Sequence, residues 1–232
     1  MTKKGILLLS GGADSTTLFV HALEKGWTIY PLSVDYGQKH AVELEAAKQI
    51  VDYYRMFYYE VKYRNCVKDL KVLNFDLSQI GHSALTDETQ EVPNSMKNQI
   101  QTVVPFRNTL LATLAAAYGE SLELNPITIF MTPVKEDFET YRDCRIPFYH
   151  SLTETLRLGS TRETEIEIIT PFIGTTKAEI IALGTKYKVP YELTHTCYKG
   201  TRPACGKCPA CIERLEAFKT NSLKDPLEYE KE

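Results

Sequence analysis

The sequence predicts an α/β fold in which helices cover both faces of a doubly wound, mostly parallel β-sheet. Short apolar runs alternate with longer segments of helical periodicity along most of the chain. A glycine-bearing turn at residues 10–15 joins the first apolar run to the first helical segment. Parallel strands that are buried on both faces read as continuous apolar runs and are joined by crossover helices. Together, the two observations favour this fold class.

Each predicted element follows from its local pattern. Continuous apolar residues predict strands, and apolar residues spaced three or four apart predict helices. In the first half of the chain, the pattern predicts a strand at residues 5–9, a helix at 16–25, a strand at 27–34, a helix at 40–51 and a strand at 57–61. In the second half it predicts a helix at 107–122, a strand at 127–131, a loop at 132–145, a helix at 148–158, a strand at 165–170, and helices at 177–187 and 211–219.

The stretch between the two halves, residues 65–101, is polar and only weakly periodic. Loops of this length in compact domains are usually functional or disordered, so a mobile excursion or lid is predicted here. The expected organisation is a main α/β domain at residues 1–190 and a small C-terminal module at residues 191–232.

Composition and charge narrow the possible function classes. The chain is 43% hydrophobic and 25% charged, as is typical of a soluble globular protein. Its net charge of −3 argues against a broadly basic surface, so no stable nucleic-acid partner is expected. No apolar run reaches the roughly 18 to 20 residues of a membrane helix, and the first apolar run is too short for a secretory signal. We therefore expect a cytoplasmic protein without membrane association.

Residues 10–15, Ser-Gly-Gly-Ala-Asp-Ser, lie between a predicted buried strand and a predicted helix. Open α/β sheets bind their ligands at this position, beyond the carboxyl ends of the strands. Two glycines let the backbone approach an anion, and the helix N-terminus presents N–H groups and a partial positive charge. Ser10 and Ser15 add hydroxyl donors, and Asp14 is suited to bind Mg²⁺ or to cap the helix. The segment is predicted to be a phosphate-binding cradle, with a plain capped turn as the alternative.

Four cysteines gather near the C-terminus in the pattern C-x7-C-x2-C-x2-C: Cys197, Cys205, Cys208 and Cys211. Four thiolates at this spacing suit a tetrahedral Zn²⁺ in a closed, structural site. An iron–sulfur cluster is the rival interpretation, because four cysteines also hold such clusters. In the cytoplasm, thiols or metal ligands are expected in place of disulfides.

Three further polar segments follow predicted strands or open a predicted helix, at residues 35–40, 104–108 and 135–145. Each alone is compatible with a solvated loop. All three are expected at the sheet edge that carries the cradle, so a single cleft is predicted. The candidate cations for neutralising phosphate charge are Lys39, Arg107, Arg142 and Arg145, with Lys177 more remote.

The motif S-G-G-x-D-S after the first strand resembles the PP-loop of the ATP pyrophosphatase superfamily, whose fold is of the adenine nucleotide alpha hydrolase-like type. The resemblance implies that the loop grips the pyrophosphate of ATP while a substrate becomes adenylated, and that Asp14 helps to hold Mg²⁺. The implied ATP-binding residues are Leu9, Ser10, Gly11, Gly12, Ala13, Asp14, Ser15, Thr16, Thr17, Leu18 and Phe19.

Further motifs, in chain order, narrow the resemblance. S-G-G-x-D-S-T-T, D-Y-G-Q-x-H, V-P-x-R-N, D-F-x-x-Y-x-D-C-R and C-G-x-C-x-A-C-x-x-R together resemble the 7-cyano-7-deazaguanine synthase family over residues 6–218. The resemblance implies a carbon–nitrogen ligase of queuosine biosynthesis that uses ATP to convert 7-carboxy-7-deazaguanine and ammonia into 7-cyano-7-deazaguanine. It also implies a zinc-binding four-cysteine module and a homodimer. The implied catalytic residues are Asp14, Arg107 and Lys39, and the implied substrate-binding residues are Tyr36, Gln38, Arg107, Asn108, Asp137, Phe138, Tyr141, Asp143 and Arg145.

One segment departs from the family pattern. Glu139 and Thr140 stand where a Ser-Gly pair is typical, and Arg142 stands where a proline is typical. The departure keeps open a related adenylating enzyme that stops at the amide, or that joins the deazaguanine carboxylate to another amine such as a protein. A zinc-bearing nucleic-acid-binding module without catalysis is a third hypothesis, which the net charge disfavours.

Overall fold

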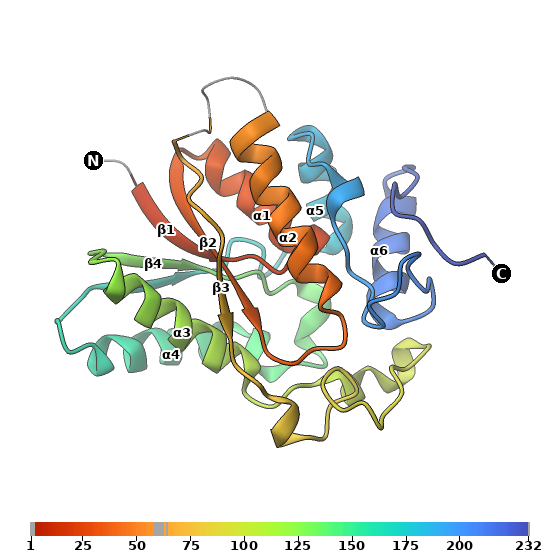
Figure 1. The fold of residues 1–232 in the computed structure, drawn as a ribbon, viewed down its shortest axis with the longest axis horizontal. Helices are drawn as coiled ribbons and strands as arrows, with labels where there is room; N and C mark the ends of the chain where they lie inside the picture. The colour runs from red at the N-terminus through yellow and green to blue at the C-terminus, as the bar shows by residue number, and fades with distance from the viewer. Residues whose placement is uncertain (1–2, 58–62, 64, 232) are drawn as a thin grey trace.

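The computed structural model describes residues 3–57, 63 and 65–231, and within them it contains a five-stranded, entirely parallel sheet in the order β3-β2-β1-β4-β5 (Figure 1). The strands are β1 (Lys3–Leu8), β2 (Trp27–Asp35), β3 (Lys71–Asn74), β4 (Ile127–Phe130) and β5 (Ile166–Ile169). The chain builds outward from β1 to β3 on one side and then crosses to β4 on the other. The predicted doubly wound α/β fold is confirmed.

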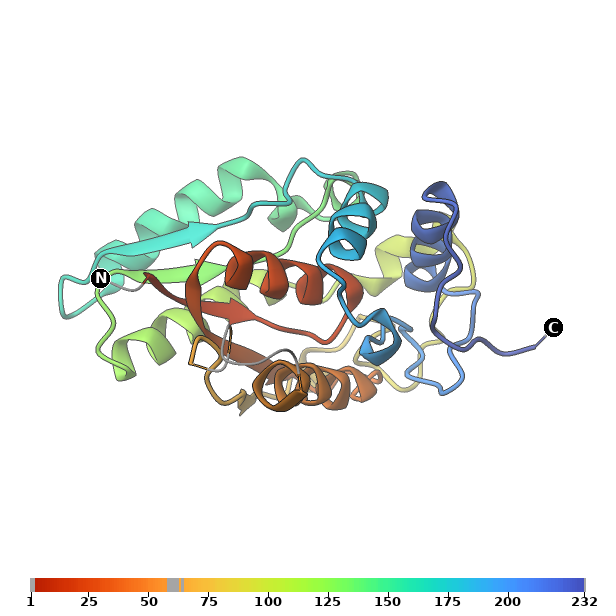
Figure 2. The same cartoon turned by 90° about the horizontal axis from the view of Figure 1, so that it is seen from above.

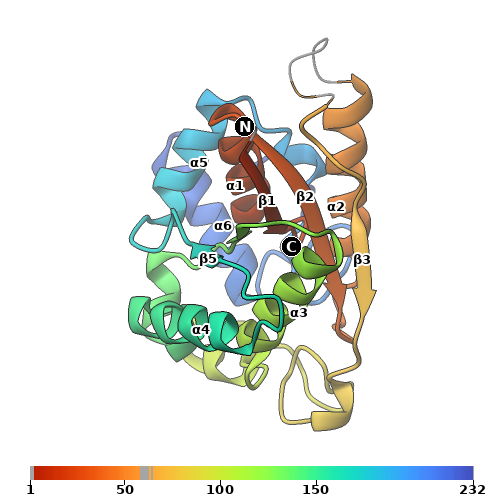
Figure 3. The same cartoon turned by 90° about the vertical axis from the view of Figure 1, so that its left-hand side faces the viewer.

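Helices cover both faces of this sheet. One face carries α1 (Ala13–Glu24), α2 (Val42–Asp52) and α5 (Lys177–Lys186), and the other carries α3 (Arg107–Ser121) and α4 (Ile146–Gly159). Figure 3 shows α1 and α5 opposite α3 and α4. Within β1, Leu7 packs into the core under α1 and α5, whereas Ile6 packs into the core under α3 and α4. Because successive strand residues point to opposite faces, one apolar run supplies both cores.

The third strand of the described sheet, β3 (Lys71–Asn74), was not predicted from the sequence. Of the predicted strand at 57–61, residues 58–61 lie outside the described residues, and Phe57 ends a π-helical turn, η1 (Tyr53–Phe57). Strand β3 comes instead from the segment predicted to be a lid, and it pairs with residues 32–35 of β2. Only two of its four residues, Val72 and Leu73, are apolar, so the apolar run is too short to predict a strand from the sequence.

The residues after β3 also fold against the sheet edge. They include two 3-10 helices, η2 (Ser78–Ile80) and η3 (Met96–Thr102). Leu77, Leu85 and Val104 form a buried cluster with Tyr36, which follows β2. The segment predicted as a mobile lid is therefore packed onto the main domain in this structure. The loop predicted at 132–145 contains two short 3-10 turns, η4 (Lys135–Phe138) and η5 (Arg142–Cys144).

The C-terminal residues form a module around the four cysteines. Its helix α6 (Pro209–Thr220) packs against α5, and Figures 1 and 2 show it at the end of the molecule away from the N-terminus. A 3-10 turn, η6 (Tyr191–Leu193), leads into it. The division of the chain at residue 190 stays a prediction. Among the described residues, no helix combines the length and hydrophobicity needed to cross a membrane.

Candidate functional site

The predicted cradle connects β1 to α1, and its backbone has little room for change. Gly11 has φ of +88°, and a Cβ built on it would lie 2.3 Å from the Glu43 carbonyl oxygen. Ser10 Oγ lies 2.9 Å from Ser15 Oγ and accepts a hydrogen bond from the Gly12 N–H at 3.2 Å. The loop is therefore held by its own hydroxyls and by α2. Helix α1 begins without a side-chain cap, so its N-terminal N–H groups suit an anion.

A cleft of about 240 Å³ opens in front of this cradle. Its walls are residues that follow β1, β2 and β4, together with the beginnings of α3 and α5 and part of the cysteine module. Strands β1 and β4 are neighbours in the sheet, and their connections leave toward opposite faces. This is the topological switch point, where doubly wound sheets bind ligands.

The cleft brings together eleven of the residues that the sequence predicted for the site. They are Leu9, Ser10, Gly12, Ala13, Asp14, Ser15, Tyr36, Gln38, Arg107, Asn108 and Asp137. The other predicted residues do not line it. They are Gly11, Thr16, Thr17, Leu18, Phe19, Lys39, Phe138, Tyr141, Asp143 and Arg145. Their roles, like those of the residues that line the cleft, stay predictions.

Several of these other residues have contacts elsewhere in the fold. Leu18 and Phe19 are fully buried in the core under α1. The ammonium of Lys39 donates to the Gln90 carbonyl oxygen at 2.5 Å. Arg145 donates two hydrogen bonds to the Phe138 carbonyl oxygen, which closes the loop after β4 on itself.

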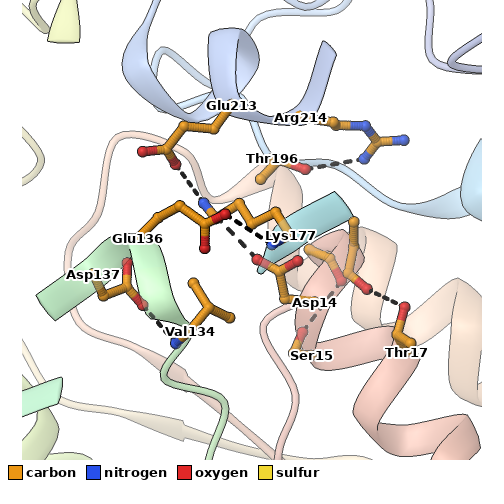
Figure 4. Close-up of polar contacts among 12 residues, drawn as sticks. Asp14, Ser15, Thr17, Val134, Glu136, Asp137, Lys177, Thr196, Glu213 and Arg214 are labelled. Carbon is orange, nitrogen blue, oxygen red and sulfur yellow. Dashed lines mark hydrogen bonds and ion pairs between the residues drawn. The ribbon is translucent and has the colours of Figure 1, made fainter. Parts of the chain in front are cut away.

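Lys177, which the sequence analysis expected to be remote from the cradle, lies beside it. Lys177 is the first residue of α5, and its Nζ lies 4.0 Å from Asp14 Oδ2 and forms an ion pair with Glu213 (Figure 4). Its backbone N–H donates to Glu136 Oε1 at 2.9 Å. A capping box between Thr176 and Glu179 starts α5 at this point. That local signal begins the helix that follows β5, so it could have placed Lys177 at the ligand-binding edge of the sheet.

The carboxyl groups of Asp14 and Asp137, which lie near Lys177, have pKa values above their ordinary range. Burial raises the pKa of Asp14, and the Lys177 ammonium opposes the shift. Burial also raises the pKa of Asp137, to about 6. For Lys177, burial lowers the pKa, but Glu213, Asp14 and Asp137 together outweigh it and leave the pKa above its ordinary value. The cleft thus holds a permanent cation beside carboxyl groups that would gain from an added Mg²⁺.

The wall across from α5 is aromatic and cationic. The Arg107 guanidinium carbon lies 6.0 Å from the centre of the Tyr36 ring. Asn108 donates to the Asp143 carbonyl oxygen at 3.4 Å, so it ties the start of α3 to η5. Burial raises the pKa of Cys144 to about 12, so its thiol is protonated at neutral pH. The planar aromatic surface and the guanidinium suit a flat, anionic ligand.

The sequence analysis assigned no role to two buried groups in the cleft, His40 and Glu43. His40 Nε2 lies 3.6 Å from Glu43 Oε2, and both side chains line the cleft. Burial lowers the pKa of His40 to about 3 and raises that of Glu43 to about 8. Around neutral pH the imidazole is therefore uncharged and the carboxyl largely protonated. His195 is also buried, but it does not line the cleft.

The four predicted cysteines do meet in space. Their Sγ atoms all lie within 4.8 Å of one another, and all four residues are buried. The Cys205 Sγ accepts hydrogen bonds from the Lys207 and Cys208 N–H groups at 3.5 and 3.3 Å. Four sulfurs so close together fit a single tetrahedral metal with bonds of about 2.3 Å. The cluster can hold a metal such as zinc or an iron–sulfur centre.

Comparisons with known proteins agree with this geometry. Residues 4–222 match the model of the family described as queuosine biosynthesis protein QueC. A protein of Picrophilus torridus named 7-cyano-7-deazaguanine synthase is 42% identical, with 98% of this chain and 92% of that protein covered. Proteins of the same name from Thermoplasma volcanium and Acetivibrio thermocellus are 40% and 38% identical; the matches cover 100% and 98% of this chain, and 92% and 98% of those proteins.

Proposed function

The chain belongs to the queuosine biosynthesis protein QueC family, and from this premise we propose that it converts 7-carboxy-7-deazaguanine and ammonia into 7-cyano-7-deazaguanine at the expense of ATP. The single observation that carries the proposal is the common cleft. It joins an uncapped helix N-terminus and a lysine to an aromatic, arginine-bearing wall. The helix N-terminus and the lysine suit the phosphates of ATP. The aromatic wall with its arginine suits a planar carboxylate. The proposed enzyme is a carbon–nitrogen ligase that acts in the cytoplasm as a homodimer.

The proposed chemistry begins with a poor electrophile, because resonance and charge protect a carboxylate from attack. A carboxylate oxygen attacks the α-phosphorus of ATP and expels pyrophosphate, which yields an acyl-adenylate. Ammonia then displaces AMP, loses a proton and leaves the amide. A second activation by ATP at the amide oxygen lets that oxygen depart with the nucleotide fragment while both amide protons are lost, which leaves the nitrile.

In this scheme the protein positions the reactants and neutralises charge. The N–H groups at the start of α1, the hydroxyls of Ser10 and Ser15, and the Lys177 ammonium bind the phosphates. Asp14 contributes a carboxylate oxygen to Mg²⁺, which would supply further charge neutralisation. On the facing wall, Arg107 binds the substrate carboxylate while Tyr36 packs against the ring.

We propose zinc as the metal of the four cysteines, in a structural role. Four thiolates close the coordination sphere of Zn²⁺ and leave no position for a substrate. The metal then stabilises the module that carries α6 and adjoins the cleft through Thr196, Tyr198 and Ala210. No chemical step passes through it.

Mass spectrometry of the products tests the proposal. Purified protein with 7-carboxy-7-deazaguanine, MgATP and ammonium should yield the nitrile. Lys177→Met should lower kcat/KM at least about 100-fold, because it removes a charge at the phosphates. Lys186→Met is the matched control, since Lys186 is an exposed residue of the same helix, and it should leave the rate unchanged.

A second candidate function follows from the residues that depart from the family pattern, Glu139, Thr140 and Arg142. ATP consumption that ends at the amide, or at an adduct with another amine, would favour the related adenylating enzyme. Absence of any ATP turnover by fully metallated protein would refute both.

A further inference from the structure

The ammonium of Lys177 has two carboxylate partners. It lies 4.0 Å from Asp14 Oδ2 and is paired with the Glu213 carboxylate (Figure 4). A lysine is a point charge on a flexible stem, so the position of its ammonium depends on which anion holds it. If it paired directly with Asp14, each group would neutralise the other. Neither would then be available to phosphate or to Mg²⁺.

Glu213 comes from a distant part of the chain and is itself held firmly. It lies on α6, in the module of the four cysteines, and its side chain is only 9% exposed. One carboxylate oxygen pairs with Lys177, and the other accepts a hydrogen bond from Gln99 Nε2 at 3.3 Å. Both oxygens are thus used, which fixes the direction of the carboxylate.

The hydrogen-bond chain continues into the loop after β4. Gln99, in η3, is 8% exposed, and its Oε1 accepts a hydrogen bond from Thr140 Oγ1 at 3.3 Å. Thr140 is one of the residues at which this chain departs from its family's pattern. A continuous chain of contacts therefore runs from Thr140 through Gln99, Glu213 and Lys177 to Asp14.

We propose that Glu213 is a positioning residue that holds the Lys177 ammonium beside the phosphate cradle and keeps its ion pair with Asp14 at 4.0 Å instead of in direct contact, with Gln99 and Thr140 setting the direction of Glu213. The inference rests on the proposed function in one respect, namely that the cradle binds ATP. It adds that the cysteine module and the loop after β4 set the geometry of the ATP site.

Titration calorimetry tests this directly, by measuring the binding of Mg²⁺ and AMPCPP, an ATP analogue whose α and β phosphorus atoms are joined by a methylene group that cannot be cleaved. Glu213→Gln should raise the Kd about 10- to 100-fold, the range of one charge-assisted contact. Glu213→Asp keeps the charge and should recover part of the affinity. The control Glu216→Gln removes an exposed carboxylate from the same helix and should change nothing. Thr140→Val, which replaces the hydroxyl by a methyl group of similar size and so removes the outermost hydrogen bond, should weaken binding by about 2- to 5-fold.

Two readouts separate positioning from a merely structural role. In turnover, the KM for ATP should rise in Glu213→Gln while the KM for ammonium stays unchanged, at an unaltered metal content. In a crystal structure of the variant, the Lys177 ammonium should lie in direct contact with Asp14. An unchanged Kd, or an ammonium that keeps its place without Glu213, would overturn the inference.

Two other outcomes are a Glu213→Gln variant that does not fold and a wild-type protein that does not bind the nucleotide. Should Glu213→Gln not fold, Glu213→Asp and Gln99→Leu decide, and wild-type affinity in both would refute the role. If the wild-type protein binds no AMPCPP, the proposed function fails. The position of the ammonium in the variant crystal structure then still decides whether Glu213 holds it.

Discussion

The ion pair between Arg214 and Asp225 joins α6 to the C-terminal residues, and we predict that Asp225→Asn strongly destabilises the protein. Nε and Nη2 of Arg214 lie 2.7 and 2.9 Å from the two carboxylate oxygens, and both side chains are 2% exposed. The same carboxylate accepts hydrogen bonds from the Leu227 N–H at 3.0 Å and the Tyr229 hydroxyl at 2.6 Å. Removing its charge leaves a buried guanidinium without a counter-ion, at a cost of about 3–5 kcal/mol.

Thermal unfolding measures this cost. In a chain of this size each kcal/mol shifts Tm by about 2–4 °C, so a decrease of roughly 6–20 °C is expected. The control is Glu123→Gln, which breaks an ion pair of 3.8 Å whose Arg162 and Glu123 side chains are 57% and 83% exposed. Exposed pairs contribute about 0–1 kcal/mol, so this variant should lose less than about 4 °C. Equal losses in the two variants would refute the reasoning that burial sets the strength of the pair.

Three further predictions concern the cradle, the acidic groups and the metal. Gly11→Ala should lower the free energy of unfolding by more than about 2 kcal/mol and weaken nucleotide binding, because its Cβ would lie 2.3 Å from a backbone oxygen at φ of +88°. Urea unfolding measures the loss of stability. Gly159→Ala is the tolerated control, since no atom lies within 4 Å of the added Cβ. Burial raises the pKa of Asp137 from 3.8 to about 6, so the native state binds the proton more tightly and the free energy of unfolding falls as pH rises between those values. Asp137→Asn should flatten that decline by ~1–3 kcal/mol in urea titrations at pH 4 and pH 7, and an identical pH dependence would contradict the assignment. Chelation should release one metal per chain by elemental analysis and lower Tm, whereas an unchanged Tm would exclude a structural metal.

The sequence predicted most of the fold because most elements carry their own pattern. The strand at 27–34 and the helix at 107–122 agree with β2 and α3 to within one residue at each end. The strand β3 was missed because its four residues are largely exposed at the edge of the sheet, where pairing with β2 does not require an apolar run.

The parts of the site that the sequence predicted best are those whose residues lie close together in the chain. Residues 10–15 are contiguous, and Cys197 to Cys211 form a short segment, so local chain geometry nearly suffices to bring each set together. For these two sets, the sequence by itself determined what chemistry they could support: an anion at a helix N-terminus and a metal among four thiolates.

The partners of Lys177 were decided only by the tertiary structure. Glu213 lies 36 residues from Lys177 along the chain, and Gln99 lies 114 residues from Glu213. These side chains meet because the packing of α6 against α5 and the path of the residues after β3 carry them to one edge of the sheet. No local pattern encodes that meeting, since it depends on strand order and on which helices pack together. The sequence therefore predicted the kind of ligand, whereas only the tertiary structure showed how the Lys177 ammonium is held beside the ligand's site.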